Sequence, residues 1–316
     1  MHQKPWIGHL ASFGAYAIFG INIVLCKDIA NEGGISPIAL FTFRSLVAGI
    51  LFWILSLFLP RQEAVTTSGR ERVPRADLLR IAVASLVGLF IPQMTFLSAI
   101  TMTTTIDTSI LSSMTPIMTM FVAAIFLKEP ITWKKAIGVA LGLSGALLLI
   151  FNSIGVTGGV DHTRPMGVLL LIVNTFSFAF YLGVFRPLIS RYSVVTFMKW
   201  MFLFSFLMSL PLSARQIFTV IDYPSVRAQV WWEIAYLIFF ATFVAYFLIP
   251  LGQKHIRPTL VSMYSYLQPI IAAAISISMG LDTLSCQKAL AVALVFAGVY
   301  VVNRSRSLAQ TKRVKN

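Results

Sequence analysis

The stretch Thr101–Phe151, TMTTTIDTSILSSMTPIMTMFVAAIFLKEPITWKKAIGVALGLSGALLLIF, is present twice in the chain. A shift of 153 positions lays it without a gap on Lys254–Arg304. A fixed offset over about fifty residues, with a proline in mid-segment, is not expected by chance in sequence that is merely apolar. The chain therefore reads as two copies of one half. The residues that keep their identity are Ser109, Pro116, Ile117, Lys135, Ala136, Val139–Leu141 and Gly145, which recur as Ser262, Pro269, Ile270, Lys288, Ala289, Val292–Leu294 and Gly298.

Composition indicates that the repeated unit lies in a lipid bilayer. The residues are 57% hydrophobic and 11% charged, whereas soluble domains have about 25% charged residues. So few charges could not cover a water-facing surface. Two cysteines exclude a disulfide scaffold, and the sequence has no metal-ligand spacing, nucleophile motif or GxxxxGK[ST] phosphate loop. We expect no metal and no cofactor.

Ten segments are long and apolar enough to span a membrane, because a spanning helix needs about 20 such residues. Turn chemistry separates them, for example at Gly33–Pro37 and Lys128–Pro130. We predict an all-α polytopic protein with five spans in each half. The segments are 7–29, 37–59, 78–98, 105–127, 133–151, 165–188, 195–213, 232–252, 258–280 and 286–303.

The halves are predicted at residues 1–151 and 165–303, with a connecting loop at 152–164 and a basic tail at 304–316. If the N-terminus is cytoplasmic, eighteen Lys and Arg residues flank that side of the spans and five flank the other. The positive-inside rule then places both termini in the cytoplasm. This bias accounts for most of the net charge of +14, so nucleic acid is not needed as a partner.

Five spans is an odd number, so the second half must enter the membrane in the opposite orientation to the first. At slightly different offsets, Lys27 matches Arg186 and Arg44 matches Lys199. Two inverted halves that exchange conformations give an outward-open and an inward-open state around one central site. The repeat therefore predicts alternating access.

The segment 105–127 carries a polar stripe, and nine of the fifteen residues Thr101–Thr115 are Ser or Thr. A stripe at matching positions in both halves would suit a shared central cavity, because polar groups at membrane depth face protein or water. The alternative is hydrogen bonding between helices, worth about 0.6 kcal/mol on average. On one helical face lie Thr105, Ser109, Ser112, Thr115 and Thr119, and their counterparts are Pro258, Ser262, Ser265, Gln268 and Ala272.

Further candidates for contact with a small molecule lie on the other helices. Amides donate and accept hydrogen bonds and tyrosine adds an aromatic face, a mixture that suits an amphipathic, zwitterionic or aromatic metabolite. Each of these residues could instead hold helices together. Pro116 and Pro269 would bend their helices where such a cavity should lie. The candidates are Tyr16, Asn22, Gln93, Asn174, Ser177, Tyr181 and Tyr246.

Two intramembrane charges are candidates for function. Arg44 lies about 10 Å into its helix at 1.5 Å per residue, where it would pair, reach back to the interface or bind a substrate carboxylate. Asp107 is the candidate for proton coupling, and its alternative is a helix cap or an ion pair. Lys27 and Lys199 are expected to anchor helix ends, and Glu129 is expected as a turn or cap residue, as is Asp282.

Helices at 133–151 and 286–303 read as structural. Gly138 and Gly142 form a GxxxG pattern, and small residues at this spacing let helix backbones approach closely. These helices would buttress the fold or pair two protomers, and the oligomeric state stays open. Cys26 and Cys286 both fall near the outer face, where free thiols are favoured over a disulfide.

The order of segments, together with Arg44 early in the second one, the turn Leu127–Pro130 and the helix Gly138–Gly145, resembles the EamA-domain family of the drug/metabolite transporter superfamily. The resemblance covers nearly the whole chain as two EamA-like units. It implies a ten-helix fold with a central cavity between the halves, and movement of small metabolites, often outward across the bacterial inner membrane. Phe19-Gly20 departs from the Trp-Gly that is common in the family.

We therefore expect a secondary transporter that exports a small metabolite such as an amino acid. The alternative within transport is uptake of a sugar or nucleotide derivative. A membrane enzyme would need acid, base or metal groups that converge at one depth, which the sequence does not show. A structural or receptor role would give no reason for matching polar stripes in both halves.

Overall fold

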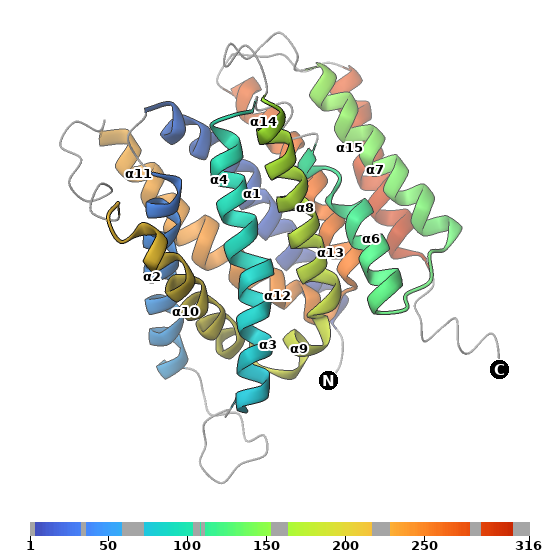
Figure 1. Ribbon diagram of the computed structural model, residues 1–316. Helices are drawn as coiled ribbons and strands as arrows, with labels where there is room; N and C mark the ends of the chain where they lie inside the picture. Colours follow the sequence, from blue (N-terminus) through green and yellow to red (C-terminus); the bar gives the residue numbers. More distant parts are fainter. Residues whose placement is uncertain are drawn as a thin grey trace.

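A computed structural model describes residues 4–32, 36–58, 73–103, 108, 111–152, 164–216, 228–278 and 286–305. Every regular element in these ranges is a helix. A helix lies in each of the ten predicted segments (Figure 1). In the first repeat they are α1 (Pro5–Glu32), α2 (Pro37–Phe58), α3 (Arg75–Ser85), η1 (Leu86–Phe90), α4 (Ile91–Ile100), α6 (Thr115–Phe126) and α7 (Trp133–Asn152).

The second repeat has the same order of long helices. Six helical runs of the described residues are long and apolar enough to cross a membrane, and two shorter apolar helices accompany them. The count of ten crossings stays a prediction. The elements are α8 (Pro165–Val184), α9 (Arg186–Arg191), α10 (Val194–Ser213), α11 (Ala228–Tyr236), η3 (Leu237–Val244), α12 (Ala245–His255), α13 (Pro258–Met263), η4 (Tyr264–Tyr266), α14 (Leu267–Ser278) and α15 (Cys286–Asn303).

Helix packing follows the internal repeat. Two helices pack on their own counterparts, α2 on α10 and α7 on α15, and the second pair lies side by side at one edge of the bundle (Figure 1). The other main contacts come in exchanged pairs: α1 with α12 matches α8 with α4, and α6 with α8 matches α14 with α1. A two-fold relation between the halves requires this pattern.

Counterpart helices run antiparallel, as an inverted repeat demands. A Cβ on Gly138 would lie 2.8 Å from the carbonyl oxygen of Gly298, and one on Gly145 would lie 2.5 Å from that of Ala291. The earlier glycine of α7 thus meets the later part of α15. Any side chain larger than hydrogen would collide here. The small residues that we interpreted as structural therefore allow the close approach of these two backbones.

Both repeats interrupt their third long helix with a π-helical segment. The Ile91 N–H bonds the carbonyl of Leu86, and the Ala245 N–H bonds that of Phe240, each five residues back. The shift of 153 places η1 inside η3. π-Helical turns widen a helix and are frequent at functional sites. The helix is therefore deformed at corresponding positions in both repeats.

The two predicted hinge prolines follow helix breaks. Pro116 lies in the first turn of α6, directly after a turn at 113–114. Pro269 lies in the first turn of α14, after the 3₁₀ segment η4. Proline is tolerated in a first helical turn because its missing N–H has no intrahelical partner there. Both repeats thus have irregular backbone at these corresponding places.

Candidate functional site

A cavity lies between the two repeats, with an empty volume of about 570 Å³ that includes the part open to solvent. Its lining comes from α1, α4, the start of α6 and, in the second repeat, α8, α12, η4 and α14. Nine of the residues singled out as substrate-contact candidates contribute to it. They are Tyr16, Asn22, Gln93, Ser112, Thr115, Asn174, Tyr246, Ser265 and Gln268.

Other candidates lie elsewhere. Tyr181 is buried against Gly88, where a Cβ would come within 2.5 Å of its ring. Ser262 is buried, and its hydroxyl donates to the carbonyl of Thr259 at 3.0 Å. Neither lines the cavity. Ser109 and Asp107 lie outside the described residues.

Three phenylalanines complete the cavity wall and were not singled out from sequence as candidates. Phe19 packs edge-on to Tyr246 with ring centroids 5.6 Å apart, and Tyr16 does so to Phe19 at 5.9 Å. Phe96 and Phe178 line the same space one helical turn from Gln93 and Asn174. Extending each polar face by three or four residues would have found all three phenylalanines. Ile23 and Pro92 complete the lining.

The side chains of Gln93 and Tyr246 meet inside the cavity. Gln93 Nε2 donates to the Tyr246 hydroxyl at 2.6 Å. These residues are 153 positions apart, so they are counterparts in the two repeats. Counterparts related by a two-fold rotation touch only where both lie next to the rotation axis. The cavity therefore contains the axis that relates the halves.

Two polar side chains of α8 satisfy the deformed backbone of the helix opposite. Asn174 Nδ2 donates to the carbonyl of Pro92 at 2.6 Å, and Ser177 Oγ donates to that of Val87 at 2.7 Å. The Val87 carbonyl lies in the π-helical segment η1, where the N–H four residues on, that of Ile91, bonds Leu86 instead. Asn174 thus has a structural role besides facing the cavity.

Arg44 does not reach back to an interface. Its side chain is 1% exposed, and Nε donates to Thr242 Oγ1 at 2.8 Å, while Nη1 has no hydrogen-bond partner among the described residues. It lies beside the Cys26 thiol, which also contacts Asn22 Oδ1 at 3.6 Å. A buried guanidinium thus stands behind the cavity wall without lining it.

Glu233 is a buried carboxylate at the start of an apolar span, and sequence reasoning passed over it. It is 5% exposed and accepts from Gln229 Nε2 at 3.0 Å. Its position one residue inside the predicted segment 232–252 is typical of an interfacial residue, so only the fold reveals its burial. Both cysteines are free: Cys26 is buried and Cys286 is exposed.

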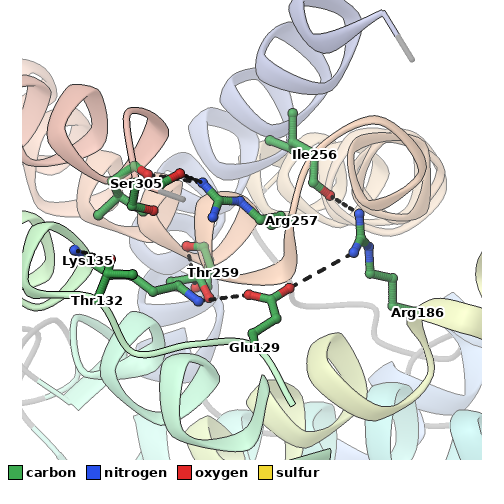
Figure 2. Close-up of polar contacts among 10 residues, drawn as sticks. Glu129, Thr132, Lys135, Arg186, Ile256, Arg257, Thr259 and Ser305 are labelled. Atoms are coloured by element: carbon green, nitrogen blue, oxygen red, sulfur yellow. Dashed lines mark hydrogen bonds and ion pairs between the residues drawn. The ribbon is translucent and has the colours of Figure 1, made fainter. Parts of the chain in front are cut away.

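A buried ion network joins the two repeats at one end of the bundle, and Figure 2 shows Glu129 between Lys135 and Arg186. The carboxylate lies 2.7 Å from Lys135 Nζ and 4.0 Å from Arg186 Nη1. Arg257 donates to the carbonyls of Val302 and Ser305 at 3.1 and 3.2 Å. Glu129, expected as a turn or cap residue, is therefore also the anion of an inter-repeat cluster.

A second inter-repeat contact lies at the same end of the bundle. Asp77 of α3 accepts from Arg191 Nη1 at 2.7 Å and from the Tyr192 hydroxyl at 2.5 Å. Burial and the hydrogen bond to Asp77 raise the pKa of Tyr192 to about 12, so its hydroxyl stays a donor. The hydrogen bond that Arg191 itself donates to Asp77 raises the pKa of Arg191. The short helix α9 is thus tied to the first repeat at both of its ends.

Lys199, expected to anchor a helix end, lies 4.7 Å above the ring of Trp53, a cation–π distance. No group of three or more His, Cys, Asp or Glu side chains that could hold a metal occurs among the described residues. Around the cavity, the described lining residues are uncharged amides, hydroxyls, aromatic rings, Ile23 and Pro92. Such a lining suits reversible binding of a small amphipathic molecule.

Comparisons with known proteins find similarity to transporters. The model described as the EamA-like transporter family matches residues 6–151 and again 165–304. "Uncharacterized transporter YetK" of Bacillus subtilis is 24% identical over 301 residues, covering 95% of this chain and 87% of YetK. "Uncharacterized transporter YyaM" of the same organism is 21% identical over 78% of each chain. A solved crystal structure matches 98% of this chain and 99% of its own with a TM-score of 0.68 at 18% identity, which shows a shared fold.

Proposed function

Since the chain belongs to the EamA-like transporter family, and is thus a multi-pass membrane transporter of small molecules, we propose that it exports an amphipathic metabolite such as an amino acid. The movement would be alternating access by two inverted five-helix repeats. Both termini would lie in the cytoplasm of a bacterial cell, as the distribution of Lys and Arg predicts.

One observation carries the proposal: the cavity between the repeats takes its lining from both of them. Because the halves are related by exchange, a site at their axis is the one place that both an outward-open and an inward-open state would share. Amides, hydroxyls and aromatic rings at this site fit a molecule with a polar end and an apolar body.

The test compares the metabolites in the medium of matched cells with and without the protein, over time. Export predicts that one chemical class accumulates outside only when the protein is present. Gln93→Ala and Ser112→Leu should each reduce this accumulation at unchanged expression, because both residues line the cavity. Lys134→Gln, an exposed charge away from the cavity, serves as the control and should leave accumulation unchanged.

No outward change in any class would contradict export, and proteoliposome assays would then test uptake, for example of a sugar or nucleotide derivative. Accumulation that both cavity variants leave untouched would keep transport but move its site out of this cavity.

A further inference from the structure

Four buried polar atoms at the cavity have no hydrogen-bond partner among the described residues. They belong to residues that line the cavity, of which Tyr16, Ser265 and Gln268 are at most 8% exposed. A buried polar group without a hydrogen-bond partner destabilises the protein, because it has lost its bonds to water. A ligand that supplies the missing partners would recover that loss of stability. The atoms are Tyr16 OH, Gln93 Oε1, Ser265 Oγ and Gln268 Oε1.

Two of these atoms, in Gln93 and Gln268, are amide oxygens, which only accept hydrogen bonds. Gln93 donates its nitrogen to Tyr246, so its oxygen is the group left over. The hydroxyl oxygens of Tyr16 and Ser265 accept as well. The unmet demand of the cavity is thus for a hydrogen-bond donor, and a group with several N–H bonds meets it best.

The rest of the lining favours the same group. Faces of aromatic rings attract an ammonium through their quadrupole, and they also accept an apolar body. Phe19 and Phe178 lie on the same helices as Asn22 and Asn174, and they line the cavity beside them. No carboxylate occurs among the described lining residues, so neutral acceptors and ring faces would have to hold an amino group there.

The position of Gln93 adds a consequence for transport. In an inverted repeat, exchanging the conformations of the halves turns a contact between two residues into the contact between their counterparts. A contact between counterparts, such as Gln93 with Tyr246, is turned into itself. The contact itself would therefore persist in both states of the cycle, so that Gln93 stays at the axis, within reach of a substrate that enters from either side.

We propose that the cavity binds the amino group of its substrate through the amide oxygens of Gln93 and Gln268, with the rings of Phe19 and Phe178 against the adjoining apolar part. The inference rests on the proposed transport function in one respect, namely that this cavity is where the substrate binds. The recognition chemistry itself is a binding property, and it is measured without transport.

The experiment uses the purified full chain in lipid nanodiscs and two pairs of probes that differ only in the amino group. L-Phenylalanine is compared with 3-phenylpropionate, and L-leucine with 4-methylpentanoate. Affinities come from the concentration dependence of thermal stabilisation. In at least one pair the amino member should bind about tenfold more tightly, since hydrogen bonds to a charged group contribute about 1.5–3 kcal/mol.

Gln93→Leu and Gln268→Leu should each reduce that preference about tenfold, and Gln268→Glu should increase it. Gln253→Leu is the matched control, because Gln253 Oε1 is also buried and without a partner among the described residues but lies outside the cavity. Gln268→Glu keeps the side-chain shape and so remains informative if a leucine variant fails to fold.

Equal binding within both pairs, no binding by either amino acid, or a preference that survives both leucine variants would overturn the proposal. Tighter binding of the deaminated members would overturn it too, and would mean that amide nitrogens face the ligand. An amine preference without any transport in cells would leave this inference standing and remove the proposed function instead.

Discussion

Lys27 and Arg186 are counterparts in the two repeats, and each caps the long helix that it faces. Lys27 Nζ donates to the carbonyls of Ile100 and Thr103 at 2.9 and 3.1 Å. Arg186 donates to those of Gln253 and Ile256 at 3.4 and 3.5 Å. The two carbonyl pairs are themselves related by the shift of 153. Duplication has therefore preserved a capping contact at opposite ends of the bundle.

The two ends differ in what else the cation does. A lysine ammonium is a compact point charge, and that of Lys27 donates hydrogen bonds to two carbonyls. Arginine has five donors in a planar fork, and Arg186 reaches Glu129 as well as its two carbonyls. The substitution of Arg for Lys thus joins helix capping to an inter-repeat ion network. The counterpart of Glu129, Asp282, lies outside the described residues.

The largest effect is expected at the carboxylate of the network. Glu129→Gln leaves the charge of Lys135, whose side chain is 1% exposed, without its ion-pair partner. Breaking a buried pair on one side costs about 3–5 kcal/mol. The unfolding temperature of the purified protein should fall steeply, and Lys135→Met added to Glu129→Gln should recover most of the loss.

Lys134→Gln is the control for this pair, because Lys134 is the exposed neighbour of buried Lys135. An unfolding temperature for Glu129→Gln that equals that of Lys134→Gln would mean that the network does not hold the repeats together.

A smaller effect is expected from exchanging the capping cations. Arg186→Lys retains a charge but loses the fork, so either a carbonyl or Glu129 loses its partner at a cost of about 1–2 kcal/mol. Lys27→Arg keeps enough donors for both carbonyls and should cost less. The unfolding temperatures of the two variants, measured side by side, test this difference between the two ends. Equal falls in unfolding temperature would contradict it.

The smallest effects are expected at Asp77. Asp77→Asn weakens the bonds from Tyr192 and from Arg191, whose side chain is 58% exposed, and should cost about 1 kcal/mol. Arg80→Gln, at a side chain 64% exposed, should change stability by less than about 0.5 kcal/mol. A loss at Arg80 as large as at Asp77 would show that Asp77 stabilises the protein through its exposed pair within α3, and not through the buried hydroxyl of Tyr192.

Much of the cavity could be predicted, because the repeat relates one polar stripe to another. Ser112 and Thr115 in one copy indicated Ser265 and Gln268 in the other, and all four line the cavity. The same reasoning selected Tyr181, which lies outside this cavity, since helical spacing gives the face of a residue but not the neighbour that covers it. Gly88 leaves room for that ring, and no spacing rule within α8 contains this information.

The membrane setting, the duplication and the family could be inferred from the chain alone, because composition and a constant offset are properties of one dimension. Which polar groups meet depends on the tertiary structure. Gln93 touches its own counterpart, Arg44 turns inward to Thr242, and Glu129 joins cations from both repeats. These contacts exist only once the antiparallel helices of the two halves pack against each other, because the partners lie far apart in the sequence.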